Sequence, residues 1–134
     1  MTRVVFDTYA ILAWLKREPG YGFVVRLLRD VAAGELWGGV SIVNMGEVLY
    51  VLAKEQGIGP AEEAVDYLVQ LSWEILPATN DIVWAAARLK ASHPISYADA
   101  FALACAQEHG ADLVTDDPEL RAAPHGVTLL WEIE

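Results

Sequence analysis

The chain has 134 residues, 54% of them hydrophobic, so one domain over residues 1–134 can bury a core without disulfides or a structural metal. Its single cysteine, Cys105, excludes an internal disulfide, and the net charge of −10 lacks the basic surface typical of nucleic-acid-binding proteins. No apolar run reaches the roughly 18 residues of a membrane helix, and no signal peptide is visible after Met1, so we expect a cytoplasmic protein.

Short apolar runs alternate with segments of helical periodicity along the whole chain. In chain order we expect a strand at residues 3–6, helices at 9–16 and 21–33, a strand at 36–40, helices at 41–56 and 60–71, a strand at 73–76, helices at 79–92 and 96–109, and strands at 112–114 and 127–131. This alternation predicts an α/β fold with three layers, in which a parallel sheet of about five strands is flanked by helices.

Four acidic residues, far apart in the sequence, are expected at one rim of that sheet: Asp7, Glu47, Asp99 and Asp117. Asp7 directly follows the first strand, and the pair Asp116-Asp117 follows the strand at 112–114. Glu47 and Asp99 fall in the first two turns of helices. Ligands of open α/β sheets bind at the carboxyl ends of the strands, so the four carboxylates could converge there.

Helix capping is the competing interpretation of these acids. Asp7 can cap the first helix, and Asp117 followed by Pro118 fits an N-cap with proline at the first helical position. Ser96 with Asp99 three residues later fits a capping box. Glu47 can belong to a solvated polar face. Each acid taken alone therefore has a structural explanation, and only the set of four indicates a site.

A cluster of carboxylates predicts a hard divalent cation. Neighbouring carboxylates raise one another's pKa, and a bound Mg²⁺ or Mn²⁺ removes that penalty because it prefers oxygen ligands. Such a cation can activate a water molecule and neutralise charge on a phosphodiester. The three histidines show no zinc-binding spacing, and no phosphate-binding glycine loop or nucleophile elbow is present.

The chain resembles the PIN-domain ribonucleases, and in particular the VapC-type toxins of prokaryotic type II toxin–antitoxin pairs. The resemblance spans nearly the whole chain and rests on four segments in the same order and spacing. They are Val4-Val5-Phe6-Asp7-Thr8, Ser41-Ile42-Val43-Asn44-Met45-Gly46-Glu47-Val48, Ile95-Ser96-Tyr97-Ala98-Asp99-Ala100-Phe101, and Leu113-Val114-Thr115-Asp116-Asp117-Pro118.

The resemblance implies a Mg²⁺- or Mn²⁺-dependent endoribonuclease that hydrolyses RNA with an activated water, acts as a homodimer and is silenced by an antitoxin protein. It implies that the catalytic, metal-coordinating acids are Asp7, Glu47, Asp99 and Asp117. The supporting residues that it implies are Thr8, Asn44, Thr115 and Asp116. An acid at both positions 116 and 117 leaves open which of the two is the fourth ligand.

Two other functions remain open at this stage. A PIN-like module without catalytic activity could use the same fold to bind a partner, with its acids serving only as helix caps. An unrelated phosphohydrolase or phosphoacceptor domain fits less well. A haloacid-dehalogenase-type phosphatase needs a second aspartate two positions after Asp7, where this chain has Tyr9.

Overall fold

The computed structural model describes residues 1–133 as an α/β fold, the class that the alternating pattern predicts. Its elements in chain order are β1 (Thr2–Phe6), α1 (Thr8–Leu15), α2 (Tyr21–Ala32), β2 (Leu36–Ser41), α3 (Ile42–Gln56), α4 (Ile58–Val69), β3 (Glu74–Leu76), α5 (Asn80–Ser92), α6 (Tyr97–His109), β4 (Asp112–Val114), α7 (Pro118–Ala122) and β5 (Leu129–Leu130).

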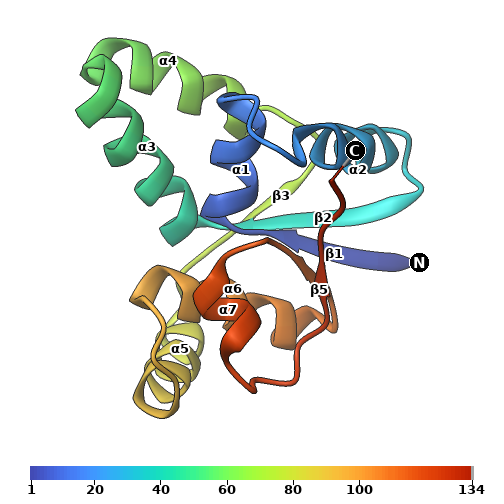
Figure 1. Cartoon of the computed structure of the whole chain (residues 1–134), viewed down its shortest axis with the longest axis vertical. Helices are drawn as coiled ribbons and strands as arrows, with labels where there is room; N and C mark the ends of the chain where they lie inside the picture. Colours follow the sequence, from blue (N-terminus) through green and yellow to red (C-terminus); the bar gives the residue numbers. More distant parts are fainter. Residues whose placement is uncertain (134) are drawn as a thin grey trace.

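The five strands pair in parallel in the order β3-β2-β1-β4-β5. From the central strand β1 the chain moves outward to β2 and β3, and it then crosses to the other side of β1 to form β4 and β5 (Figure 1). The strand order therefore reverses between β1 and β4. In parallel α/β sheets this switch point, at the carboxyl ends of the strands, is the usual position of a ligand site.

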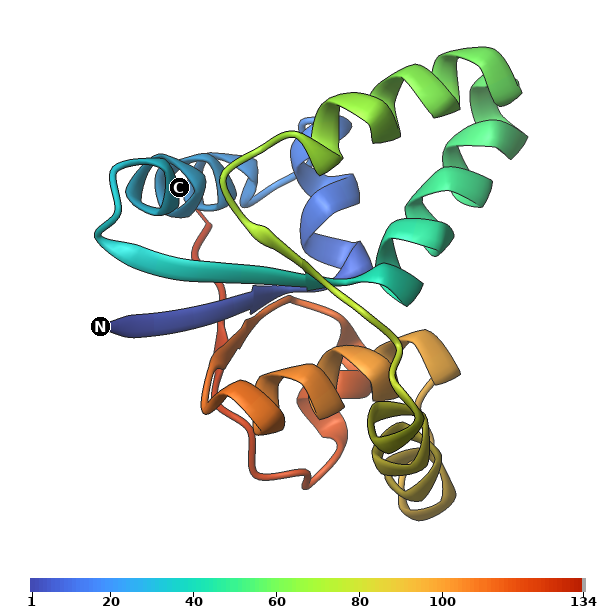
Figure 2. The same ribbon diagram turned by 180° about the vertical axis from the view of Figure 1, so that it is seen from behind.

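Helices cover both faces of the sheet and create two hydrophobic cores. Alternate residues of β1 point to opposite faces, as the pleat of a strand requires. Val4 and Phe6 pack with α1, α2, α3 and α4, whereas Val5 packs with α5, α6 and α7. Figures 1 and 2 show these two helical layers on either side of the strands, with α3 and α4 forming a helical pair that extends away from the sheet.

The predicted elements are all present, and their differences lie at the ends. Helix α4 begins at Ile58, so Pro60 lies within its first turn and does not start it. Proline is tolerated there because the first N–H groups of a helix have no acceptor within the helix. The expected strand at 127–131 contains only Leu129–Leu130 as regular structure.

Helix α6 is the most buried helix of the fold. Every residue from Asp99 to Ala106 is buried, including Cys105, which is the small buried apolar residue that the sequence predicts. Alanine dominates this stretch, so the helix can approach the sheet closely. Within residues 1–133, neither α6 nor another helix is both long enough and apolar enough to cross a membrane.

The turn between α1 and α2 gives a first testable prediction. Gly20 has a φ of +94°, and a Cβ atom built on it would lie 2.6 Å from Nε1 of Trp131. Gly20→Ala therefore combines an unfavourable backbone conformation with a steric clash, and we expect it to lower the free energy of unfolding by about 1–3 kcal/mol. Chemical denaturation measures this loss, with Gly59→Ala as the control because nothing lies within 4 Å of its Cβ position.

Candidate active site

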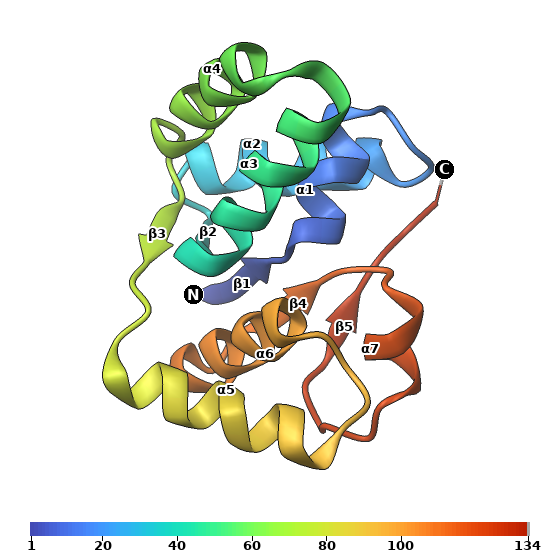
Figure 3. The same cartoon turned by 90° about the vertical axis from the view of Figure 1, so that its left-hand side faces the viewer.

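The four predicted acids lie at the carboxyl edge of the sheet, where α1, α3, α6 and α7 begin. Figure 3 faces this edge, with α1 and α3 on one side of the strands and α6 and α7 on the other. Asp7 follows β1, and Asp117 stands three residues after the end of β4. Glu47 lies on α3, and Asp99 lies in the first turn of α6. The switch point of the sheet thus places Asp7 and Asp117 on adjacent strand ends.

Asp7 is the most deeply buried of these acids, with 1% of its surface exposed. Its Oδ1 accepts a hydrogen bond of 2.8 Å from the backbone N–H of Ala10, so it caps α1 as the competing interpretation expects. Its Oδ2 is buried and has no hydrogen-bond partner. The pKa of Asp7 is raised to about 8, mainly by burial; the nearby charges of Asp99 and Asp117 contribute to the rise, and Thr115 and Ala10 oppose it.

Asp99 is the second acid with a perturbed pKa, and 9% of its surface is exposed. Ser96 caps α6 by accepting a hydrogen bond of 3.1 Å from the backbone N–H of Asp99, which holds the first turn in place. Burial raises the pKa of Asp99 to about 6, and the charges of Asp117 and Glu47 act in the same direction. Asp7 and Asp99 are therefore costly to ionise together without a counter-charge.

Asp117 and Asp116 have different surroundings. Oδ1 of Asp117 caps α7 by accepting hydrogen bonds from the N–H groups of Glu119 and Leu120, and its own N–H donates to Oγ1 of Thr115. Asp117 lines the same pocket as Asp99 and Glu47. Asp116 instead forms an ion pair of 3.4 Å with Arg121.

Glu47 lines this pocket from α3, and it keeps an exposed portion. Its Oε2 accepts a hydrogen bond of 3.2 Å from the hydroxyl of Tyr50, one turn further along the helix. This contact holds the carboxylate at the mouth of the pocket. Glu47 is thus partly exposed to solvent and caps no helix. It also lines the pocket together with Asp99 and Asp117.

We use the term acidic pocket for the cavity of about 300 Å³ that Glu47, Asp99 and Asp117 line together with Thr8, Ser96 and Glu119. Asp7 is not among its lining residues. The apolar lining residues, here called the apolar wall, are Tyr9, Leu12 and Val51. They were not among the predicted site residues. The spacing carries a signal for this wall, because Tyr9 and Leu12 are three apart on α1, and Glu47 and Val51 are four apart on α3.

The donor set of the acidic pocket fits a hard divalent cation. All of its charged donors are carboxylate oxygens, and the buried Asp7 beside them has no positively charged partner among the described residues. Within residues 1–133, no three acidic, histidine or cysteine side chains yet stand close enough to surround one ion. The carboxylates therefore need side-chain rotations to enclose a cation between them.

The comparison with protein families decides the classification. A family model described as the PIN domain matches residues 4–126, which include all four acids. The chain belongs to the PIN domain family. No curated protein matches the sequence.

Solved structures share the fold of this PIN domain along its whole length. A chain of VapBC2 from Rickettsia felis, bound to a DNA fragment from its promoter, aligns with a TM-score of 0.72 and 18% identity over 98% of this chain and 100% of that chain. DNA-bound VapBC from Salmonella typhimurium aligns with a TM-score of 0.74 and 17% identity over 97% of this chain and 98% of that chain. VapC20 from Mycobacterium tuberculosis, a Sarcin-Ricin loop cleaving toxin, aligns with a TM-score of 0.74 and 18% identity over 96% of this chain and 99% of that chain.

A buried amide joins the two sides of the PIN-domain site. Asn44 lies fully buried on α3, and its Nδ2 donates to Oγ1 of Thr8 at 3.0 Å and to the carbonyl of Ala98 at 3.2 Å. One side chain thus connects the start of α1 with the residue before Asp99. Asn44 and Glu47 lie one turn apart on α3 but differ in burial: Asn44 is buried and connects the helices, whereas Glu47 lines the pocket.

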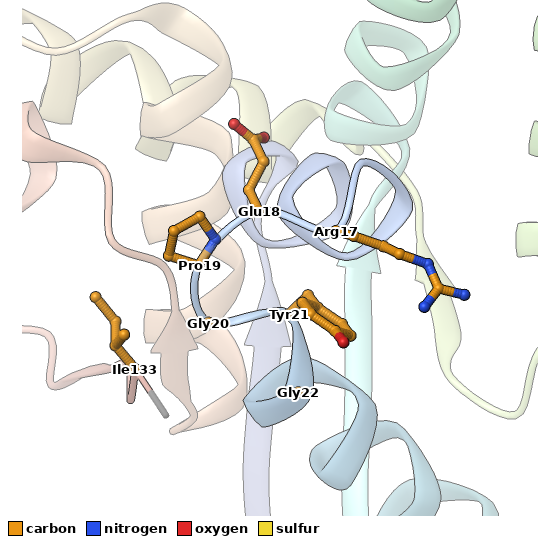
Figure 4. Close-up of a pocket in the computed structure, with 7 residues that line it drawn as sticks. All are labelled: Arg17, Glu18, Pro19, Gly20, Tyr21, Gly22 and Ile133. Carbon is orange, nitrogen blue, oxygen red and sulfur yellow. The ribbon is translucent and has the colours of Figure 1, made fainter.

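A larger hollow of about 500 Å³ lies at the turn between α1 and α2, away from the acidic pocket. Figure 4 shows Arg17, Glu18, Tyr21 and Ile133 around it. The two charged side chains point in different directions there, and none of the four predicted acids lines it. The candidate active site of this PIN domain is therefore identified by its carboxylates and not by the volume of its cavity.

Proposed function

We propose that this PIN domain is a Mg²⁺- or Mn²⁺-dependent endoribonuclease that hydrolyses RNA phosphodiester bonds and acts as the toxin of a toxin–antitoxin pair. One observation carries the proposal: at the switch point of the sheet, Asp7 is fully buried with an unpartnered oxygen, beside Asp99 and Asp117. Burying a carboxylate without compensation is costly, and the raised pKa of Asp7 reflects this cost. A bound divalent cation would offset it.

The chain's own residues have distinct parts in this proposal. Asp7, Glu47, Asp99 and Asp117 would hold the cation. When bound, the cation lowers the pKa of a coordinated water and neutralises charge on the phosphodiester. Thr115 supports both Asp7 and Asp117, and Ser96 fixes the turn that carries Asp99. Thr8 and Asn44 fix the distance between the two helices that present the acids.

The proposed partners of this chain are inferred from the similar solved structures and from its net negative charge. The similar solved structures include VapBC complexes and a toxin that cleaves the Sarcin-Ricin loop, which supports an RNA substrate and a cognate antitoxin. With 19 acidic and nine basic residues, the chain would bind RNA through cation–phosphate contacts and not through a general positive field. The same acidity favours a basic antitoxin. We further propose a homodimer acting in the cytoplasm.

A catalytically silent binding module is the second candidate. Two observations favour it: Asp7 and Asp117 both cap helices, and the carboxylates of residues 1–133 do not already surround one ion position. Capping alone does not explain Asp7, however, because an exposed asparagine or serine would cap α1 equally well without the cost of burying a carboxylate.

RNA cleavage with a matched pair of variants tests the proposal. Purified protein is incubated with a pool of structured and single-stranded RNA in Mg²⁺, in Mn²⁺ and with chelator. Asp117→Asn keeps the helix cap but removes a proposed ligand, so we expect at least about 100-fold slower cleavage. Asp116→Asn removes only the partner of Arg121, and we expect activity within a few-fold of the wild type.

Two results would contradict the proposal. The first is cleavage that continues in chelator, and the second is equal activity of the Asp117→Asn and Asp116→Asn proteins. If no RNA in the pool is cleaved and no divalent cation raises the melting temperature, the binding-module function is favoured.

A further inference from the structure

The apolar wall of the acidic pocket has no part in holding a cation. Tyr9, Leu12 and Val51 line the same cavity as Asp99 and Asp117, so the pocket offers apolar surface as well as carboxylates. A phosphodiester needs only the carboxylates and their cation. The bases attached to it are flat and apolar on their faces, and they require a surface such as an aromatic ring.

Tyr9 presents its ring to this pocket from a fixed position. It has 38% of its surface exposed, and its ring packs edge-on against Trp131 with the centroids 5.5 Å apart. Trp131 in turn packs edge-on against Phe23 at 6.2 Å. The absence of a side chain at Gly20 lets Trp131 occupy its place. Trp131 and Phe23 thus pack in a row with Tyr9, which keeps part of its surface exposed and lines the cavity.

We propose that Tyr9 stacks on a nucleobase of the RNA and thereby positions the adjacent phosphodiester against Asp99 and Asp117, with Leu12 and Val51 completing the base-binding wall. This inference rests on the proposed ribonuclease function and assigns it a binding residue outside the acidic set. Stacking on an aromatic ring tolerates different bases, because every base has a π face. The contact therefore selects unpaired nucleotides over duplex.

The surroundings of Tyr9 suit this role. A tyrosine phenol is uncharged at neutral pH. It adds no repulsion toward phosphate. Within residues 1–133 the hydroxyl has no hydrogen-bond partner, so Tyr9 is held by ring packing, and phenylalanine can replace it.

Binding of a fluorescent RNA tests the stacking directly. The probe is a single-stranded RNA oligonucleotide of mixed sequence that carries 2-aminopurine at one position, moved along the strand in a set of oligonucleotides, with Ca²⁺ as an oxygen-binding cation. We expect the wild type and Tyr9→Phe to quench the probe at one or two positions. Tyr9→Leu should abolish this quenching and weaken RNA binding between about 5-fold and 100-fold.

Tyr21→Leu is the matched control. Tyr21 is equally exposed, at 39%, but it lies at the hollow shown in Figure 4 and not in the acidic pocket. We expect the Tyr21→Leu protein to bind the RNA and to quench the 2-aminopurine fluorescence as the wild type does. Melting temperatures of all three variants, measured without RNA, separate a loss of stacking from a loss of the folded state.

Several outcomes would overturn the inference: no quenching at any position with the wild type, quenching that persists in folded Tyr9→Leu, or an equal loss in Tyr21→Leu. Cleavage assays distinguish this failure from that of the ribonuclease proposal. If Tyr9→Leu cleaves RNA with unchanged KM and kcat, the ribonuclease proposal is supported and the stacking role of Tyr9 is contradicted. If the wild type quenches the probe but cleaves no RNA with Mg²⁺ or Mn²⁺, the stacking role is supported and the ribonuclease proposal is contradicted.

Discussion

Asp7→Asn is expected to slow RNA cleavage on the order of 1000-fold while making the metal-free protein more stable. Asparagine has nearly the same shape as aspartate and is an equally good N-cap, so the hydrogen bond from Ala10 can remain. It carries no charge, so the cost of burying an ionised group disappears. If Asp7 served only the fold, its replacement would not lower the cleavage rate while raising the stability of the metal-free protein.

Two measurements on the same preparation check this expectation. Initial rates of RNA cleavage give the loss of activity, and thermal unfolding at pH 8 in chelator gives the change in stability. Asp66→Asn serves as the control because Asp66 is an exposed aspartate on α4, and we expect neither quantity to change there. If Asp7→Asn lowers both activity and the melting temperature, Asp7 is needed mainly for the fold.

The stability of the metal-free wild type is expected to fall as the pH rises. The pKa of Asp7 is about 8 in the folded chain against 3.8 in the absence of burial, and that of Asp99 is about 6. A raised acid pKa means that the folded protein holds protons that the unfolded chain has released. The contribution of these two groups to the free energy of unfolding is therefore fully present below about pH 4, and Asp7 alone lowers it by up to about 1.4 kcal/mol per pH unit until about pH 8.

Divalent cations should reverse this loss. Binding only to the folded state stabilises it, and the effect grows when the ligands are ionised. We expect Mg²⁺ or Mn²⁺ to raise the melting temperature strongly at pH 8, weakly at pH 5, and hardly at all in Asp7→Asn. Thermal unfolding over a pH series, with and without cation, provides the data. The linkage would be refuted if the wild type did not lose stability relative to Asp7→Asn between pH 4 and pH 8 in chelator. It would also be refuted if a divalent cation raised the melting temperature of Asp7→Asn as much as that of the wild type.

The order of the elements could be predicted from sequence because each signal is local. The β-branched run at Val4 and Val5, the caps Ser41, Thr79 and Ser96, and the glycine at position 110 each depend on a few neighbouring residues, and the structure has elements at all of them. The acids were found for a related reason. Asp7 directly follows β1 and Asp117 comes three residues after β4, and parallel strands end at one edge of the sheet.

The apolar wall and the burial of Asn44 could not be predicted, because they depend on how distant elements meet. Tyr9 lies next to Trp131 only when β5 and the chain after it return past α1. Asn44 looks like a surface residue on a helical wheel, yet it is buried because Thr8 and Ala98 approach it from two other helices. The roles of the acids as cation ligands likewise remain a prediction.

The pairing of β1 with β4 has a consequence for a chain still being synthesised. Val4 pairs with Asp112, so the central strand lacks one neighbour until residue 112 has left the ribosome. A growing chain then contains Asp7 and Glu47 long before Asp117 arrives beside them. The proposed nuclease site is therefore incomplete in a nascent chain until residues 112–117 have been made and have joined the sheet.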